Sequence, residues 1–459
     1  MKILRNTPYD QLEVGMEAET RRLCVADDLY VFAHSSGNMN PVHLPKHDGD
    51  GDGRPEAMAP SAWVAALISS VLGNTLPGPG TLYLQQVSRF VGRAHAGDTL
   101  VVRVRLKEKL GDRKALFDTT VTLADGTPVL EGEALVLAPD HTSSFDPGDV
   151  PGLVVESHAH FDKILAEAEP LDPIPTAVVA PEEANSLGGA LLGYEHTIIH
   201  PILIGDSEKI RAAAEDLGVD ISGLELIHAD SHRQAAATGV RLVLEGRAQA
   251  LMKGHLHTDD LLGEVVKRDG GLRIGRRLSH IFVMDVPGLS HLLFVSDAAI
   301  NIAPDLETKK DIVQNAIDLA RALGVEVPKV GVLSAVETVS PRIPSTLDAA
   351  ILSKMAERGQ ITGGIVDGPL AMDNAMDIKA ARTKGIKSLV AGNADILIAP
   401  NMESANMLAK ELTFVAHAEA GGIVLGARCP IILTSRSDDD KARLASCAVA
   451  ALYAKRNDR

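Results

Sequence analysis

Aromatic residues are scarce in this chain. One Trp, five Tyr and eight Phe make up 3% of its 459 residues. The buried cores must therefore be built mainly from Ala, Val, Leu and Ile, which favours alternating strands and helices over a β-sandwich. At roughly 100–200 residues per domain, a chain of this length predicts two to four domains.

Basic charge and cysteine are also in short supply. Acidic side chains number 61 against 45 Lys and Arg, so the formal net charge is −16. Because a phosphate backbone binds to a basic surface, nucleic acid is not expected as a partner, and any anionic substrate must be held by a few local cations. The three cysteines, Cys24, Cys429 and Cys447, are too few and too far apart to predict a disulfide framework or a zinc site.

The sequence contains no long apolar run. It has no stretch of about 18 uninterrupted apolar residues, so no membrane span is expected. The first residues, MKILRNTPYDQLEVG, have no long apolar core, which argues against a signal peptide. Together with the cysteine content, which fits a reducing compartment, this predicts a cytoplasmic protein.

Residues 1–137 have the pattern of one domain. An apolar helix is predicted at 61–72, and a run of strands follows, separated by turn signals. The strands are expected at 82–91, 99–108, 115–123 and 129–137. One apolar helix followed by antiparallel strands indicates a helix wrapped by a curved sheet.

The rest of the chain has a different texture. Residues 138–157 carry three prolines and little periodicity, which is typical of a linker. From 158 to 459 apolar strands alternate with helices, which predicts parallel α/β sheets arranged in two lobes. Strands are expected at 176–179, 201–203, 250–252, 281–284, 331–333, 396–398 and 431–433, with helices such as 209–217, 309–323 and 348–358 between them.

Three segments place polar or small residues directly after these strands, where parallel sheets bind their ligands. They are LMKGHLHTDDLL (251–262), IVDGPLAMDNA (365–375) and IILTSRSDDD (431–440). In the third, Ser435 and Arg436 offer a hydroxyl and a bidentate anion ligand, and the aspartates at 438–440 offer a base. On spacing alone, a solvated helix start with Asp in its first turn explains that segment equally well.

The first of these segments adds a cation and two histidines. Lys253 at a strand end can neutralise phosphate as a point charge, although a surface lysine is the simpler interpretation. His255 and His257 form an H-x-H pair without a third ligand, and the acidic loop 47–56 lacks the final Glu of a calcium loop. We therefore expect no metal site.

Taken together, these segments resemble the phosphate acetyl/butyryl transferase family, and more closely its butyryltransferase-like branch. The match runs through NSLGGAL (185–191), HPILIG (200–205), ALMKGHLHTDDLL (250–262), VMDVP (283–287), SDAAINIAPDLETK (296–309), AVETVSPRIPSTLDAA (335–350), GGIVDGPLAMDNA (363–375), AGNADILIAPNMESANML (391–408) and LTSR (433–436). The resemblance implies two α/β lobes of the isocitrate/isopropylmalate dehydrogenase type, with the active site in the cleft between them. Lobe one is expected at about 158–290 with 430–459, lobe two at about 291–429, and the family works as dimers.

The resemblance also implies a mechanism and a set of site residues. Coenzyme A and phosphate are the substrates, no cofactor is bound, and the acyl group moves without a covalent acyl-enzyme. Ser435 and Arg436 match the positions that hold the acyl phosphate and stabilise the oxyanion. The base lies among Asp438, Asp439 and Asp440; we favour Asp440, although the loop is shorter than in the acetyl-specific branch.

The substrate-binding positions depart from the acetyl-specific branch in one respect. That branch carries an arginine shortly after the H-T motif, where this chain reads Leu262-Gly263-Glu264. Lys253 is expected to replace that arginine. The further candidates for substrate binding are His255, Asp367 and Asn374, with the alternative that Asp367 only caps a turn.

The N-terminal segment VADDLYVFAHSSGNMNPVHL (25–44), with LPGPGTLY (76–83) and AHAGDTL (94–100), resembles the MaoC-like (R)-specific enoyl-CoA hydratases, which implies a hot-dog fold. Hydration in that family uses an Asp and a His. His43 is present, but Asn38 stands where the family has Asp, and an amide cannot take the proton. The His-Gly segment that supplies an oxyanion donor reads Ala59-Pro60-Ser61 here.

Three interpretations of this domain remain open. It binds acyl-CoA or mediates assembly without chemistry, it retains hydratase activity through His43, or it catalyses another thioester reaction. A loop histidine that only holds its own turn also explains His43. The sequence thus predicts a degenerate hot-dog domain fused to a phosphate acyltransferase. The alternatives are a bifunctional hydratase/acyltransferase and a non-catalytic acyl-CoA-binding scaffold.

Overall fold

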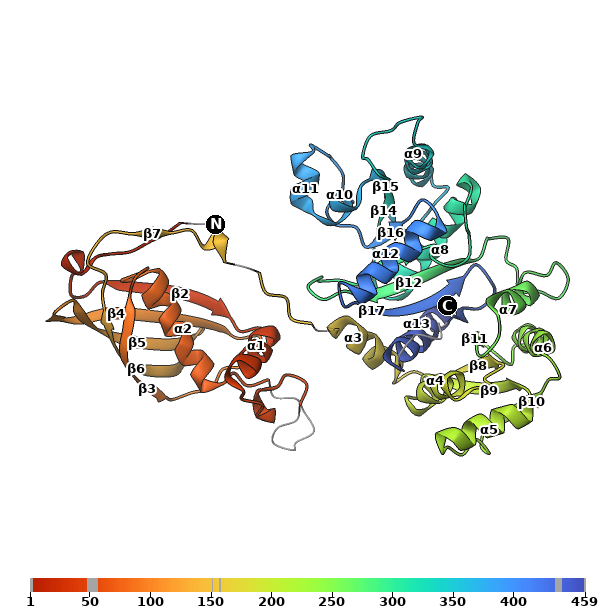
Figure 1. Ribbon diagram of the computed structural model, residues 1–459, viewed down its shortest axis with the longest axis horizontal. Helices are drawn as coiled ribbons and strands as arrows, with labels where there is room; N and C mark the ends of the chain where they lie inside the picture. The colour runs from red at the N-terminus through yellow and green to blue at the C-terminus, as the bar shows by residue number, and fades with distance from the viewer. Residues whose placement is uncertain (1–2, 48–56, 151, 157, 434–439, 458–459) are drawn as a thin grey trace. The chain divides into compact units, whose positions relative to one another are not determined.

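The computed structural model describes residues 3–47, 57–150, 152–156, 158–433 and 440–457 (Figure 1). The chain divides into two compact units, Met1–Val155 and Glu156–Arg459, each with its own hydrophobic core. Within the described ranges, no helix is long and apolar enough to cross a membrane.

The first unit is a helix packed against an antiparallel sheet. The strand order is β2 (Glu17–Leu23), β4 (Thr99–Gly111), β5 (Lys114–Leu123), β6 (Pro128–Leu137) and β3 (Leu82–Phe90). Helix α2 (Ser61–Asn74) buries Trp63, Ile68 and Leu72 against the sheet. Along β4 buried and accessible residues alternate, because successive side chains of a strand point to opposite faces. The predicted helix and four strands are confirmed, in the arrangement expected of a hot-dog fold.

Shorter elements complete this unit. They are β1 (Leu4–Arg5), η1 (Tyr9–Gln11), α1 (Ala26–Ser36), η2 (Pro41–His43), β7 (Ser144–Phe145) and η3 (Pro147–Asp149). β7 falls within the segment 138–157 that the sequence predicts as a linker. It pairs antiparallel with β1, so this part of the segment is hydrogen-bonded to the start of the unit.

The second unit is built on one sheet of eleven strands. Their order is β10 (Glu225–His228), β9 (Ile199–Gly205), β8 (Ile174–Val179), β11 (Ala250–Lys253), β18 (Ile431–Ile432), β17 (Glu419–Leu425), β12 (Ser279–Asp285), β13 (Leu293–Ser296), β16 (Ile396–Ile398), β14 (Lys329–Leu333) and β15 (Ile365–Leu370). The helices are α3 (Ala159–Ala168), α4 (Ala184–Glu195), α5 (Ser207–Leu217), α6 (His232–Leu244), α7 (Thr258–Val265), α8 (Leu306–Ala322), α9 (Pro344–Glu357), α10 (Met372–Met376), α11 (Ile378–Thr383), α12 (Met402–Phe414) and α13 (Asp440–Asn457).

The sheet contains two parallel sets of strands. β10, β9, β8, β11 and β18 run parallel, and so do β13, β16, β14 and β15. β17 and β12 join the sets, and every pair from β18 to β13 is antiparallel. The prediction of parallel sheets is therefore wrong at the centre. The connections after β12 (286–292) and after β17 (426–430) are too short for a parallel crossover, so each strand must turn back.

The core of the second unit follows from its composition. Among the described residues, the largest buried cluster includes only two aromatic side chains, Phe161 and Phe294, and is otherwise aliphatic. Helix α13 packs on β17 and also on α3 and α4, which are helices from much earlier in the chain. The predicted strands and helices of this unit are present, with ends shifted by a few residues.

Candidate functional site

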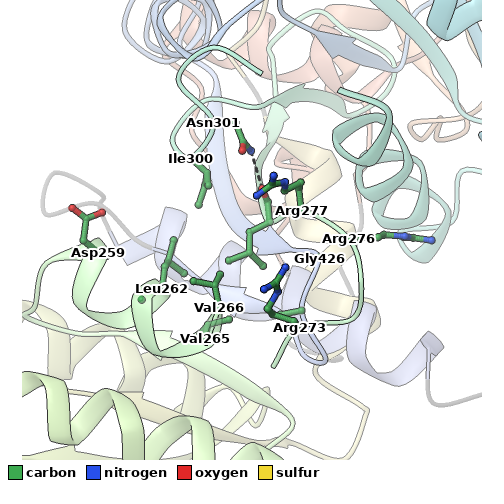
Figure 2. Close-up of a pocket in the computed structure, with 13 residues that line it drawn as sticks. Asp259, Leu262, Val265, Val266, Arg273, Arg276, Arg277, Ile300, Asn301 and Gly426 are labelled. Carbon is green, nitrogen blue, oxygen red and sulfur yellow. Dashed lines mark hydrogen bonds between the residues drawn. The ribbon is translucent and has the colours of Figure 1, made fainter. Parts of the chain in front are cut away.

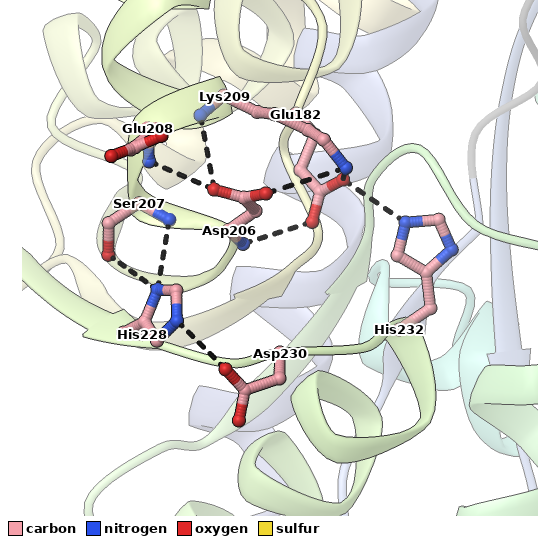
Figure 3. Close-up of polar contacts among 8 residues, drawn as sticks. All are labelled: Glu182, Asp206, Ser207, Glu208, Lys209, His228, Asp230 and His232. Carbon is pink, nitrogen blue, oxygen red and sulfur yellow. Dashed lines mark hydrogen bonds and ion pairs between the residues drawn. The ribbon is translucent and has the colours of Figure 1, made fainter.

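Polar side chains gather where the first parallel set ends (Figure 3). Glu182 follows β8, and its side chain is only 5% exposed. Its carboxylate accepts hydrogen bonds from the backbone N–H of Asp206 (3.0 Å) and from Nε2 of His232 (3.1 Å), and it lies 3.5 Å from Nζ of Lys209. Burial opposes ionisation of Glu182, but these partners outweigh burial and lower its pKa.

Lys253 is the last residue of β11, and His255 follows shortly after it, so both lie at the same ends of the parallel strands as Glu182. Nδ1 of His255 is 2.8 Å from Oε2 of Glu183, and the His255 ring meets the His232 ring edge to face, with centroids 6.3 Å apart. Nζ of Lys253 donates to the carbonyl of Gly254 at 3.4 Å. The structure therefore brings these two sequence candidates together.

The parallel register connects this edge to the predicted catalytic loop. Met252 in β11 pairs with Ile432 in β18, so Lys253 is level with Leu433. Ser435, Arg436 and Asp439 themselves lie outside the described residues. The chain enters that loop directly beside Lys253.

Asp440 is the first residue of α13, and its side chain is exposed. Its Oδ1 lies 3.7 Å from Nη1 of Arg443, whose side chain is only 6% exposed. Gly189 in α4 makes room for this arginine, because a Cβ there would lie 2.5 Å from Cδ of Arg443. The glycine of the NSLGGAL segment thus seats a buried cation next to the favoured base.

Asp367 and Asn374 lie elsewhere. Asp367 is in β15, at the far edge of the sheet, seven strand positions from β11, which corresponds to roughly 30 Å. Its Oδ1 accepts the N–H of Gly368, as expected of a residue that caps its own turn. Asn374 is fully buried and donates to Oε2 of Glu337 at 3.4 Å. Within one chain, the structure does not bring these two residues to Lys253.

A pocket of about 450 Å³ lies beside α7 (Figure 2). Its walls come from four segments: α7, the connection to β12, the residues after β13 and the connection from β17 to β18. The lining residues are Asp259, Leu262, Gly263, Val265, Val266, Arg273, Arg276, Arg277, Leu278, Ile300, Asn301, Gly426 and Ala427. Three arginines in one pocket form a cationic region in a strongly acidic chain.

Asp297 shapes the wall after β13. Its carboxylate accepts the backbone N–H groups of His280, Ala299, Ile300 and Asn301 at 3.0–3.1 Å. Nδ2 of Asn301 donates both to this carboxylate and to the carbonyl of Leu278. Asp297, only 3% exposed, thereby fixes the loop that carries Ile300 and Asn301 into the pocket.

The sequence interpretation did not single out Arg273, Arg277 or Asn301. The only signal for the arginines was local: R-x-x-R-R in an acidic chain, between α7 and β12. Asn301 belongs to the SDAAIN stretch, but nothing in the stretch alone says which side chain faces a cavity. The pocket is made by segments more than a hundred residues apart.

The first unit holds His43 and Asn38 in a loop after α1. Nδ1 of His43 donates to the carbonyl of Met58 at 2.8 Å, because a carbonyl can only accept. Nε2 is then the nitrogen that can take a proton. Oδ1 of Asn38 accepts the backbone N–H of Asn40 at 3.2 Å, so Asn38 stabilises its own turn.

Comparison with known proteins covers both units. The family profile described as "Phosphate acetyl/butaryl transferase" matches residues 229–451. A phosphate acetyltransferase of Rhizobium meliloti is 56% identical over 296 residues, which is 64% of this chain and 94% of the relative. A phosphate butyryltransferase of Clostridium acetobutylicum is 40% identical over 64% of this chain and 98% of its own length.

Solved structures are similar to each part as well. A branched-chain phosphotransacylase from Enterococcus faecalis has a TM-score of 0.55 and 29% identity, over 61% of this chain and 99% of its own. An (R)-hydratase from Pseudomonas aeruginosa is 36% identical over 34% of this chain and 99% of its own, with a TM-score of 0.32.

Proposed function

The chain belongs to the phosphate acetyl/butyryl transferase family, and from this membership we propose that its second unit interconverts acyl-CoA plus phosphate with acyl phosphate plus CoA. The observation that carries the proposal is the register of β11 beside β18. It sets Lys253 level with Leu433, which shortly precedes the Ser435–Arg436 pair in the sequence, and this supports a shared site for a phosphate cation and the predicted oxyanion ligands.

The proposed chemistry is a direct exchange. In the CoA-acylating direction, Asp440 takes the thiol proton of CoA, and the sulfur attacks the acyl carbon. The bond from that carbon to the phosphate oxygen then breaks and phosphate leaves, while Arg436 and Ser435 hold the phosphate and the oxyanion. In the reverse direction a phosphate oxygen attacks the thioester, and the leaving sulfur recovers the proton.

The cysteines support direct attack rather than an acyl-enzyme. Burial raises the pKa of Cys429 and of Cys447 to about 12. Burial, with the nearby charges of Asp28 and Asp98, raises the pKa of Cys24 to about 11. Since the thiolate is the nucleophile, none of these thiols is activated for acyl transfer near neutral pH.

The test is phosphate-dependent loss of the thioester of acetyl-CoA and butyryl-CoA, assayed with the full chain. We expect turnover with at least one of them, because relatives of both names are similar to this chain. No turnover over several chain lengths would leave the non-catalytic scaffold as the remaining interpretation.

For the first unit we propose binding of CoA thioesters without hydration. The Asn38 amide supports this, since it cannot exchange a proton and its oxygen is used in its own turn. The orientation of His43, with Nε2 available, is the observation that favours the second candidate, a bifunctional enzyme. Crotonyl-CoA hydration by the wild type, lost in His43→Ala, would support the bifunctional enzyme and contradict our proposal.

We further propose a cytoplasmic homodimer or higher homo-oligomer, with two lobes of the isocitrate dehydrogenase type and no bound cofactor. Exposed apolar residues on and after α12 support self-association: Met407, Phe414 and Val415 are 70–71% exposed. Light scattering of the full chain tests the oligomer. A monomer at micromolar concentration would contradict it.

A further inference from the structure

Two arginines of the pocket beside α7 have no carboxylate partner at ion-pair distance within the described part of the chain. They are Arg273 and Arg277, both exposed and both in the connection between α7 and β12. In a chain of net charge −16, most cations of the pocket region would be expected to be neutralised. The third arginine of the pocket, Arg276, is neutralised in this way, because its Nη1 lies 2.5 Å from Oδ2 of Asp318 in α8.

The backbone that carries these arginines is held on several sides. The N–H of Arg277 donates to Asp311 and its carbonyl accepts from Asn315, both at 3.0 Å and both from α8. Arg273 forms a β-bridge with Ala427, next to a hydrogen bond from the N–H of Arg428 to the carbonyl of Leu272 (2.9 Å). A fixed backbone with guanidinium groups directed at a cavity is the arrangement of a preformed ligand site.

Gly426 allows this close packing. It has φ +99°, and a Cβ there would collide with the carbonyl oxygen of Arg277. Only glycine accepts both the positive φ and the approach of the two chain segments. The loop from β17 to β18 and the arginine segment are therefore packed together at the edge of the pocket.

The opposite wall leaves space rather than charge. Gly263 in α7 lines the pocket, and a Cβ there would meet no atom within 4 Å. Asp259 is the acidic side chain of the pocket, and Figure 2 shows it at the end of α7 away from Arg273. Asp305 feels the charge of Arg277, but its pKa is lowered chiefly by hydrogen bonds from Thr308. The two guanidinium groups thus remain available to a ligand.

We propose that Arg273 and Arg277 form a phosphoanion-binding subsite for the acyl transfer. Guanidinium groups bind phosphate oxygens in a bidentate manner, and a volume of about 450 Å³ accommodates a phosphate with part of a larger substrate. The subsite supplies the cations that a strongly acidic chain needs to bind anionic substrates. The role of this subsite in acyl transfer rests on the proposed function. Its anion is either the transferred phosphate or a phosphate group of CoA.

The experiment compares Arg273→Ala, Arg277→Ala and the double variant with the wild type, using the full chain. Arg268→Ala is the matched control, since it removes the same side chain from the same connection between α7 and β12, but Arg268 is exposed and does not line the pocket. We expect KM for a phosphoanion substrate to rise about tenfold or more in the double variant, because charge-assisted hydrogen bonds are lost. The control should stay near the wild type.

Two arms identify the anion. A rise in KM for inorganic phosphate, with KM for CoA unchanged, assigns the transferred phosphate. A rise in KM for CoA that disappears when 3′-dephospho-CoA is the substrate assigns the 3′-phosphate; a rise that remains assigns the diphosphate. If all KM values of the double variant stay within about twofold of the wild type, or if Arg268→Ala raises them equally, the subsite is refuted.

Two further measurements separate this inference from the proposed function. Thermal unfolding of each variant shows whether a loss reflects folding. If the wild type has no transferase activity, the proposed function fails, and calorimetry of CoA and of inorganic phosphate binding to the intact protein decides the subsite alone. Weaker binding of either ligand by the double variant, but not by Arg268→Ala, supports the subsite, and unchanged binding of both contradicts it.

Discussion

At the scale of single residues, the charge next to Asp440 is the notable feature of the proposed catalytic loop. Arg443 is almost completely buried, yet within the described residues its closest carboxylate partner is the exposed Asp440 at 3.7 Å. Burial of an arginine costs desolvation, and the contact with this carboxylate offsets part of that cost. Arg443 can hold the Asp440 carboxylate in place to receive the thiol proton.

The first prediction concerns the catalytic loop. Arg436→Ala and Asp440→Asn should each lower kcat by about 10²–10³-fold, because they remove oxyanion stabilisation and proton transfer. The thermal midpoint should hardly change, since neither side chain is proposed to pack in a core. Steady-state rates with acetyl-CoA and butyryl-CoA, together with calorimetric melting, check this. Near-wild-type rates in either variant would remove that residue from the proposed site.

The second prediction concerns His280 and pH. Burial lowers its pKa to about 4 from an ordinary value of 6.5, although the charge of Asp297 opposes this shift. The unfolded chain therefore binds a proton between about pH 6.5 and 4 that the folded chain does not bind. Stability should be fully present above about pH 6.5 and fall as the pH drops to 4, by on the order of 3 kcal/mol from this group.

Denaturant unfolding at a series of pH values measures that loss. In His280→Asn the decline between pH 6.5 and 4 should be smaller than in the wild type. His257, which is exposed and lies in the same unit as His280, provides the control, and His257→Asn should keep the wild-type slope. An unchanged slope in His280→Asn would contradict the assignment of this pH dependence to His280.

At the scale of elements, glycines in α4 allow the close packing of α4 against α13. Gly189 faces Arg443 across the helix pair, and Gly193 faces Cys447 and Ile199 with a Cβ distance of 3.1 Å. Both glycines lie in the middle of α4, where Gly costs helix stability relative to Ala. Close approach of α13, rather than helix propensity, explains them.

The third prediction follows from this contact. Gly189→Ala should destabilise the fold by about 1–3 kcal/mol through overpacking, and it should lower transferase activity by displacing Arg443 from Asp440. The adjacent Gly188→Ala is the control, because its Cβ would meet only ordinary contacts at 3.8–3.9 Å with Leu217. Thermal melting and kcat of both variants test this. Equal melting temperatures and kcat values of the two variants would mean that the position of Arg443 does not depend on Gly189.

At the scale of the whole molecule, the chain is two units with separate cores. The buried cluster of the first unit contains residues from 12 to 138, and the clusters of the second unit contain residues from 161 onward. Compact units with their own cores are usually able to fold alone.

The fourth prediction is that each unit folds and works by itself. A fragment of residues 156–459 should retain the transferase kcat/KM of the full chain, and a fragment of residues 1–155 should unfold in one cooperative transition. Activity assays and melting curves of the two fragments check this. Loss of transferase activity in the fragment of residues 156–459 would mean that the first unit supports the transferase site.

The sequence anticipated the elements better than their arrangement. Apolar runs such as 174–179 and 250–253 are fixed by local pattern, so the strands were predicted and are present. The antiparallel pairing of β12 with β17 at the centre joins strands that are far apart in the chain, so no local pattern predicts it. Lys253 and His255 could be placed at a strand end from the sequence because a strand end is a local feature.

The sequence by itself determined the family, the helix and strand positions and the candidates at strand ends, because motifs and periodicity are written in neighbouring residues. Only the tertiary structure decided that Asp367 and Asn374 lie at the other edge of the sheet from Lys253. It also decided that Arg273, Arg277 and Asn301 share a pocket with Gly263. These relations depend on contacts between segments far apart in the chain, which form only when the sheet assembles.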